Sequence, residues 1–159
     1  MVLNACAFAD MVQDDDGRMI KASPAGQQLA FEIAQHVFDR ICNNKPYGVT
    51  PNPVIYGTLI KCCGRLDLPD SDVAVKSAMK AFQNCCRAGQ VSDFVLTQLR
   101  YALRPEQFLA VLVKNGYKDL DRNGKRLSRD GRRFRNIRVD ELPPEWTVNG
   151  RHRNYDRSR

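Results

Sequence analysis

Histidine is scarce in this chain, and long apolar runs are missing from it. The 159 residues include two histidines, His36 and His152, and no Cys-x-x-Cys spacing, so a Cys/His zinc site would need an unusual set of distant ligands. No run of about 18 apolar residues could span a bilayer. No basic segment followed by an apolar one, the pattern of a signal sequence, stands at the start. We therefore expect a soluble chain with no metal, no membrane partner and no visible targeting peptide.

Motifs of catalysis are missing as well. The sequence has no phosphate-binding loop, no paired acid motif and no H-x-E with C-x-x-C deaminase signature. A nucleophile and its base would have to come from scattered residues. The sequence therefore predicts a binding module that is not an enzyme, with no cofactor and no small-molecule substrate.

The chain does have six cysteines, which could suggest a disulfide framework. However, Cys62-Cys63 and Cys85-Cys86 are adjacent pairs, and neighbours in sequence make poor disulfide partners for each other. The cysteines also lie within or beside helical patterns. We expect free thiols in a reducing compartment, most of them small core residues.

One segment of the chain occurs twice, and such repeats decide the architecture. Its members match in two sets, Ala30, Ala34 and Phe38 with Ala74, Ala78 and Phe82 at a shift of 44 residues, and Leu3 and Cys6 with Ile60 and Cys63 at a shift of 57. The difference between the two shifts leaves 13 extra residues inside the first copy. They fall around Asp14-Asp15-Asp16-Gly17, a polar composition typical of a surface loop between two helices.

Helical periodicity supports a repeated helix pair. Apolar residues recur on one face from Leu29 to Ile41 and again from about Val54 to Cys63. A further helix, which Ser71 or Asp72 can cap, stops near residue 89.

A third pair follows at residues 93–103 and 105–115. Pro105 fits the first turn of its second helix, and Gly116 can end that helix in a left-handed conformation.

The fold class that follows is all-α, a short right-handed α–α superhelix (solenoid) of stacked helix-turn-helix repeats with an irregular basic C-terminal tail. The helical domain is expected to span residues 1–115, in units of about 1–52, 53–93 and an atypical 94–115. Residues 116–159 are expected to form a basic, partly disordered tail.

The tail carries most of the net charge of +7, because 13 Lys and Arg face 7 Asp and Glu from Lys118 onward. One interpretation is a solvated extension; the other is an arm that binds phosphates and gains affinity by counterion release. The phosphate-binding candidates are Arg126, Arg129, Arg132, Arg133, Arg135 and Arg138. Trp146 offers a large apolar area that could anchor the tail on the helical stack.

A family resemblance rests on residues 51–66, which read PNPVIYGTLIKCCGRL. This run resembles the first helix of a pentatricopeptide repeat, whose pattern is roughly P-D-x-V-T-Y-N-x-L-I-x-x-C-x-x-x-G. The A-x-x-x-F pattern of the family's second helix matches Ala34 to Phe38 and Ala78 to Phe82. The resemblance covers residues 2–93 well and 94–115 loosely.

The resemblance implies single-stranded RNA as the partner, with one base read per repeat by side chains at two places. Carried over to this sequence, those places are Asn52, Gly57 and Asp93. A glycine has no side chain to touch a base edge. Asn52 and Asp93 also suit helix caps, and both roles can coexist. Work in a mitochondrion or chloroplast, on organellar RNA processing or expression, is implied by the same resemblance.

Two functions stay open at this point. The first is RNA binding through the concave face of the stack, assisted by the basic tail. The alternative is an α-solenoid scaffold for other proteins, since stacked helices also make a groove for a partner peptide. Arginine on the concave face would favour RNA, whereas an apolar groove would favour a peptide.

Overall fold

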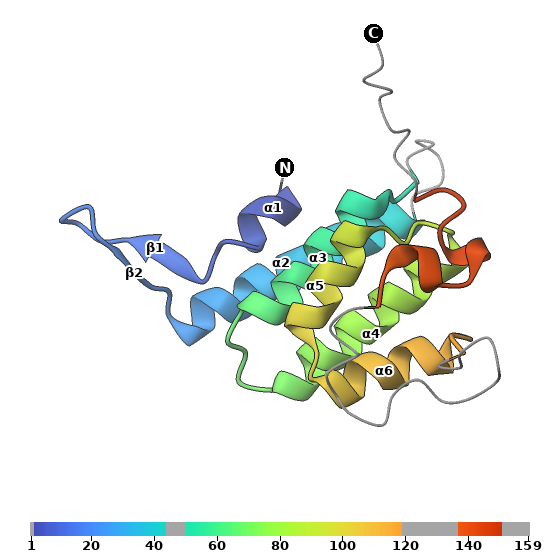
Figure 1. Ribbon diagram of the computed structural model, residues 1–159. Helices are drawn as coiled ribbons and strands as arrows, with labels where there is room; N and C mark the ends of the chain where they lie inside the picture. Colours follow the sequence, from blue (N-terminus) through green and yellow to red (C-terminus); the bar gives the residue numbers. More distant parts are fainter. Residues whose placement is uncertain (1, 44–49, 119–136, 151–159) are drawn as a thin grey trace, which may run out of the picture.

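The computed structural model describes residues 2–43, 50–118 and 137–150, and most of this part of the chain is helical (Figure 1). The elements in chain order are α1 (Val2–Cys6), β1 (Met11–Gln13), β2 (Met19–Lys21), α2 (Pro24–Asn43), α3 (Pro53–Arg65), α4 (Ser71–Arg87), α5 (Asp93–Ala102), α6 (Pro105–Lys114) and the short 3-10 helices η3 (Val139–Glu141) and η4 (Pro144–Trp146). The prediction of a mainly helical chain is confirmed. No helix within the described ranges is long and apolar enough to cross a bilayer.

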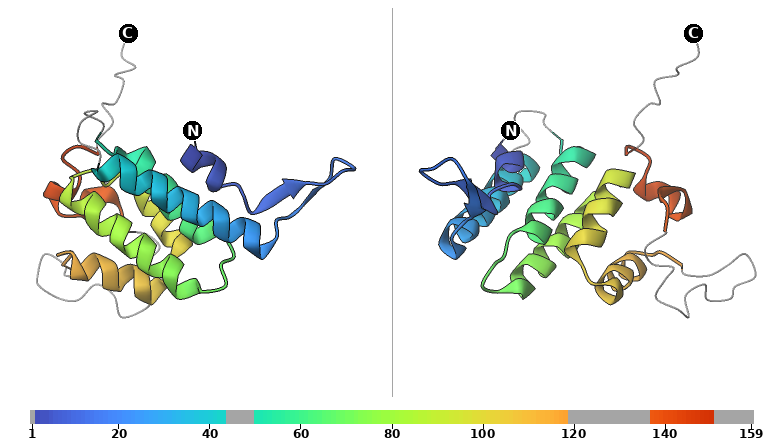
Figure 2. Two further views of the ribbon diagram at one scale, coloured as in Figure 1. Left: turned by 180° about the vertical axis from the view of Figure 1, so that it is seen from behind. Right: turned by 60° about the vertical axis from the view of Figure 1, so that its left-hand side comes forward.

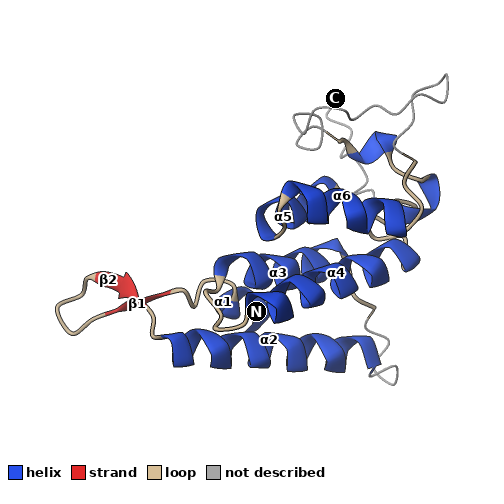
Figure 3. Cartoon of the chain, turned by 90° about the horizontal axis from the view of Figure 1, so that it is seen from below, coloured by secondary structure: helices blue, strands red, loops and turns tan. Residues whose placement is uncertain are grey.

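The helices follow one another in pairs, and neighbouring pairs lie side by side. α1 packs on α2, α3 on α4 and α5 on α6, while α3 also contacts α1, α2 and α5. Figures 2 and 3 show the pairs in chain order, with α3 and α4 in the middle. Because α3 has neighbours on several sides, most of its residues are buried, including Tyr56, Leu59 and Ile60.

Two glycines let α5 lie close to α3. A Cβ atom on Gly64 would stand 2.8 Å from Cα of Ala102, and a Cβ atom on Gly57 would overlap the Phe94 ring. A larger side chain at position 64 would therefore push the two helices apart, because backbone atoms cannot turn aside as a side chain can.

Thiols fill part of the core. All six cysteines are free, and only Cys42 among them is not buried. Cys6 and Cys63, which hold the same place in the repeat, both lie in the core as predicted. Burial raises the pKa of Cys62 and Cys63 to about 12, so both stay protonated at neutral pH and pack as small apolar groups.

The insertion in the first repeat is a β-hairpin, so the all-α prediction and the predicted loop are both corrected here. β1 and β2 pair antiparallel with Val12 opposite Ile20. The turn is closed by Asp14, whose Oδ1 accepts the backbone N–H groups of Asp16 and Arg18 at 3.1 and 2.7 Å. Gly17 has a φ of 79°, a conformation that favours glycine. The β-branched residues Val12 and Ile20, which favour strands, pair on either side of an Asp-rich turn and account for the hairpin.

Helix ends follow the sequence with small shifts. The N-cap of α4 is Asp70, whose side chain accepts the N–H of Asp72 at 2.9 Å, so the predicted caps Ser71 and Asp72 are wrong by one or two residues. Gly116 has a φ of 112° just after α6, which confirms the left-handed end predicted there.

Residues 137–150 return to the helical body, so the hydrophobic core does not stop at residue 115, where the sequence analysis ended the helical domain. Ile137 and Leu142 are buried in the same core as the helices. The Trp146 indole is only 4% exposed. It meets the Phe82 ring of α4 edge to face, with ring centres 5.8 Å apart. The predicted anchoring role of Trp146 is therefore confirmed.

Backbone hydrogen bonds join this segment to the turn between α4 and α5. The N–H of Val91 donates to the carbonyl of Trp146 at 2.8 Å, and the N–H of Asn149 donates to the carbonyl of Gly89 at 2.7 Å. Arg100 of α5 donates to the carbonyl of Ile137. Residues 137–150 thus form one ordered clasp beyond α5, seen at the far end of the stack in Figure 2.

Candidate nucleic-acid interface

Asn52 and Asp93, two of the three predicted base-reading residues, stand at the starts of α3 and α5. The Oδ1 atom of Asn52 accepts the N–H of Ile55 at 2.9 Å, which confirms its capping role. Asp93 is the first residue of α5 rather than its cap, because Ser92 caps that helix through the N–H of Val95 at 3.4 Å. Both predicted residues are exposed.

Gly57, the third predicted position, is buried under the side chain of Phe94. Phe94 is itself 39% exposed, so its ring presents an outer face to solvent where Gly57 presents none. At this place in the stack, the group that a ligand would meet is an aromatic ring from the next helix pair.

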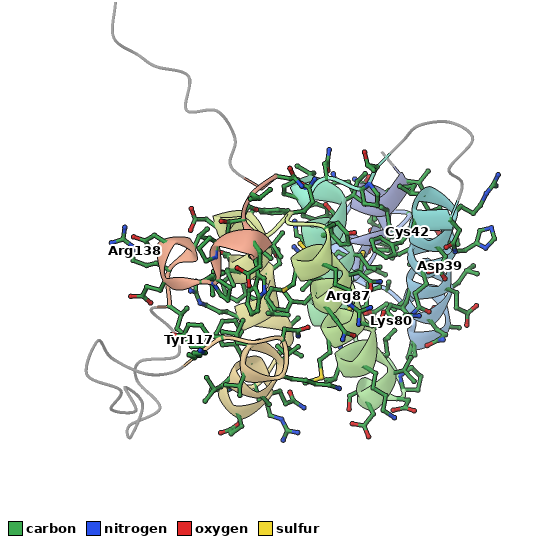
Figure 4. All side chains as sticks on the ribbon, turned by 90° about the vertical axis from the view of Figure 1, so that its right-hand side faces the viewer. Asp39, Cys42, Lys80, Arg87, Tyr117 and Arg138 are labelled. Atoms are coloured by element: carbon green, nitrogen blue, oxygen red, sulfur yellow. The ribbon has the colours of Figure 1, made fainter. Side chains whose placement is uncertain are left out.

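The tail arginines fall mostly outside the described residues, as Arg126, Arg129, Arg132, Arg133 and Arg135 all do. Arg138 is described and lies at the outer side of the clasp (Figure 4). Its Nε atom is 3.1 Å from Oδ1 of Asp140, and both side chains are well exposed. This pair partly cancels the charge of Arg138 near the helical body.

A surface that the sequence analysis did not single out runs across α3, α5 and the turn that follows α1. It combines exposed aromatic rings with basic and amide side chains around an open hollow of about 430 Å³, which lies between α3 and α5. We call it the aromatic–basic face, and its members are Phe8, Lys61, Arg65, Gln98 and Tyr101.

The basic side of this face is held in place by Phe8 and Asp10. The Nζ atom of Lys61 lies 3.8 Å from the centre of the Phe8 ring, and the Arg65 guanidinium lies 4.8 Å from it. Arg65 also donates from Nη2 to both carboxylate oxygens of Asp10, at 3.0 and 2.8 Å. These contacts limit the positions that the two cations can take. They are weak, since a cation over an exposed ring gains only about 0.5–1 kcal/mol.

The opposite side of the hollow is formed by Gln98 and Tyr101 of α5. Tyr101 is 80% exposed, which is unusual for so large an aromatic side chain and leaves its ring free to stack. Gln98 lies one turn before it and lines the same hollow, with an amide that can both donate and accept hydrogen bonds. Aromatic rings beside cations and an amide can hold a base and its phosphate together.

Part of this face could have been found in the sequence. Lys61 and Arg65 are four residues apart on one helix, and so lie on the same side of it. Nothing in the sequence, however, brings Phe8 or Tyr101 to the same place, because each comes from a different helix pair.

No model of a protein family matches the chain, and neither a curated protein nor a solved structure matches it significantly.

Proposed function

We propose that this protein binds single-stranded RNA through the aromatic–basic face and has no catalytic step of its own. The observation that carries the proposal is the pairing of the exposed Tyr101 ring with Lys61 and Arg65 across one hollow of about 430 Å³. Basic side chains at the hollow favour RNA over the peptide alternative, for which an apolar groove would be expected.

Each member has a role that its chemistry supports. Tyr101 stacks on a base, an interaction that contributes about 1–3 kcal/mol per base. Lys61, which has no ion pair among the described residues, is the main phosphate contact, and Arg65, fixed beside Phe8 by Asp10 and partly neutralised by it, assists. The Gln98 amide forms hydrogen bonds with a base edge.

The finer architecture belongs to the same proposal. The three helix pairs are a short right-handed solenoid of pentatricopeptide type, with α1, α3 and α5 along the concave side. Support comes from the succession of contacts, in which α3 touches both α1 and α5. Asn52 and Asp93 then flank the bound strand, while Phe94 replaces Gly57 as the group that meets a base. Organellar RNA processing or expression is the setting that the resemblance implies.

Fluorescence anisotropy of a labelled single-stranded RNA tests the proposal. Tyr101→Ala should weaken binding by about 1–3 kcal/mol, or roughly 5- to 150-fold in Kd. Lys61→Glu should weaken binding to all RNA sequences. The negative slope of log K against log salt should become shallower by about 0.7, the contribution of one phosphate contact in a single strand.

Arg87→Glu is the charge-matched control, since Arg87 is an exposed residue at the end of α4, away from the face (Figure 4). It makes the same change in net charge as Lys61→Glu. If the two variants lose affinity equally, the RNA responds to net charge and the face has no special role. If no form of the protein binds RNA, the protein-scaffold alternative is favoured.

A further inference from the structure

The β-hairpin is exposed on all sides and has apolar residues that nothing covers. It extends away from the helical body (Figure 1), and all six residues of β1 and β2 are exposed. Four of them are large and apolar, namely Met11, Val12, Met19 and Ile20. A two-stranded hairpin is at best marginally stable alone in water, so a surface that covers these side chains would stabilise it.

The tip of the hairpin adds net negative charge to this apolar stem, because Asp14, Asp15 and Asp16 outnumber the one basic residue of the turn, Arg18. Asp14 is occupied in closing the turn, whereas Asp15 and Asp16 are exposed beside it. A surface that receives the hairpin should therefore combine an apolar floor with a basic rim.

A hollow between α4 and α6 has that composition. It measures about 370 Å³, and Met79 and Val111 supply its apolar part. Lys76, Lys80 and Lys114 line it as well, and we call it the lysine hollow. Among the described residues, ion pairs join Lys21 to Asp67, Arg65 to Asp10 and Arg138 to Asp140, so none of the three lysines has a carboxylate partner there.

We propose that the hairpin of one copy docks in the lysine hollow of a second copy, so that molecules associate head to tail. The two surfaces complement each other in charge, Asp15 and Asp16 against three lysines, and in their apolar residues. A molecule does not fill its own hollow, because the hairpin extends from the α1–α2 side of the body while α6 lies on the other side of α3 and α4 (Figure 3). The hairpin and the lysine hollow share no residue with the aromatic–basic face, so the docking proposal does not depend on the proposed RNA binding.

The geometry sets the form and the strength of the association. Different patches meet on the two copies, so the contact is heterologous. An open row then ends in a free hairpin at one end and a free hollow at the other. A single hairpin covers little surface, and contacts that bury less than about 1,200 Å² in total are typical of weak encounters. Association should therefore grow with protein concentration and decline with salt.

Sedimentation velocity of the full chain over a range of concentrations tests the proposal. The sedimentation coefficient of the wild-type protein should rise with concentration at low salt and return toward the monomer value at high salt. The tip variant Asp15→Lys with Asp16→Lys and the hollow variant Lys76→Glu with Lys80→Glu should each remain monomeric, because tip and hollow then carry charge of the same sign. Both variants change only exposed side chains, so the fold is kept.

Mixing the two variants gives the sharpest outcome. In the mixture, the acidic tip of the hollow variant fits the basic hollow of the tip variant. The basic tip of the tip variant likewise fits the acidic hollow of the hollow variant, so an equimolar mixture should associate. Glu32→Lys with Asp39→Lys, which reverses two exposed acids on α2, is the control for the tip variant and should associate at least as well as wild type.

Three results would overturn the proposal. The wild-type protein could stay monomeric at every concentration, or the mixture could fail to associate. The hollow variant could also associate like wild type while losing RNA affinity, which would assign the lysines to RNA instead.

Discussion

Replacing Trp146 with alanine removes the side chain that holds the C-terminal clasp on α4. The indole is 4% exposed and packs edge to face on Phe82, so the loss is that of a fully buried large side chain. Substitutions of this kind cost about 3–5 kcal/mol. The aromatic pair accounts for about 0.5–1.5 kcal/mol of that loss. The hydrogen bonds of Val91 to Trp146 and of Asn149 to Gly89 weaken at the same time, since both depend on the clasp staying in place.

The free energy of unfolding in urea, followed by far-UV circular dichroism, measures this effect. Val148→Ala is the matched control, because Val148 lies two residues away and is 70% exposed. We expect it to change stability by no more than about 0.5 kcal/mol. The chain has a single tryptophan, so its fluorescence in the wild-type protein reports only on the clasp. A loss of less than about 1 kcal/mol for Trp146→Ala, or wild-type emission typical of an indole in water, would refute the docked clasp.

Three further predictions concern the core. The buried Gln27 side chain donates from Nε2 to the carbonyl of Ala22 at 2.9 Å and accepts the N–H of Asp67 at 2.8 Å. Gln27→Leu should therefore lower the free energy of unfolding by about 1–3 kcal/mol for each backbone group left unpaired. An unchanged free energy of unfolding in urea would contradict this prediction. Gly64→Val should lower the urea midpoint of unfolding by an amount that corresponds to about 1–3 kcal/mol, because α3 and α5 must separate. Gly26→Ala, at an exposed glycine of α2, is the control and should not lower that midpoint. Burial raises the pKa of Cys62, Cys63 and Cys86 to about 12, so the folded state keeps protons that the unfolded state loses above about pH 9. Stability should be constant with pH below that value and then fall by up to about 1.4 kcal/mol per pH unit for each thiol, and Cys62→Ala should reduce the slope; an unfolding midpoint unchanged from neutral to strongly alkaline pH would contradict the burial.

The helices could be predicted from the sequence because their signal is local. Apolar residues three and four positions apart define α2, α3 and α4, and prolines and cap residues mark their starts. The cap of α4 was misplaced because Asp70, Ser71 and Asp72 are all good caps, and only the backbone geometry selects one of them. The hairpin was missed because its two strands are very short and leave little periodicity to detect.

The candidate site could be predicted only in part, since its contacts join distant parts of the chain. Gly57 was a predicted base-reading position only by resemblance, and nothing in the sequence indicates that Phe94 covers it. Lys61 was read only as part of a helical repeat, and its contact with Phe8 requires α1 and α3 to lie side by side. Trp146 could be predicted as an anchor because its indole offers a large apolar area that can cover the end of the helical stack.

Ultraviolet cross-linking of the full chain to single-stranded RNA, with the linked residues identified by mass spectrometry, tests the central claim most directly. We predict cross-links in the peptides that contain Phe8, which follows α1, and Phe94 and Tyr101 of α5, all of them exposed aromatic residues. Tyr101→Ala should remove the strongest of them. Cross-links confined to residues 119–159, with none in the helical pairs, would contradict RNA binding by the aromatic–basic face.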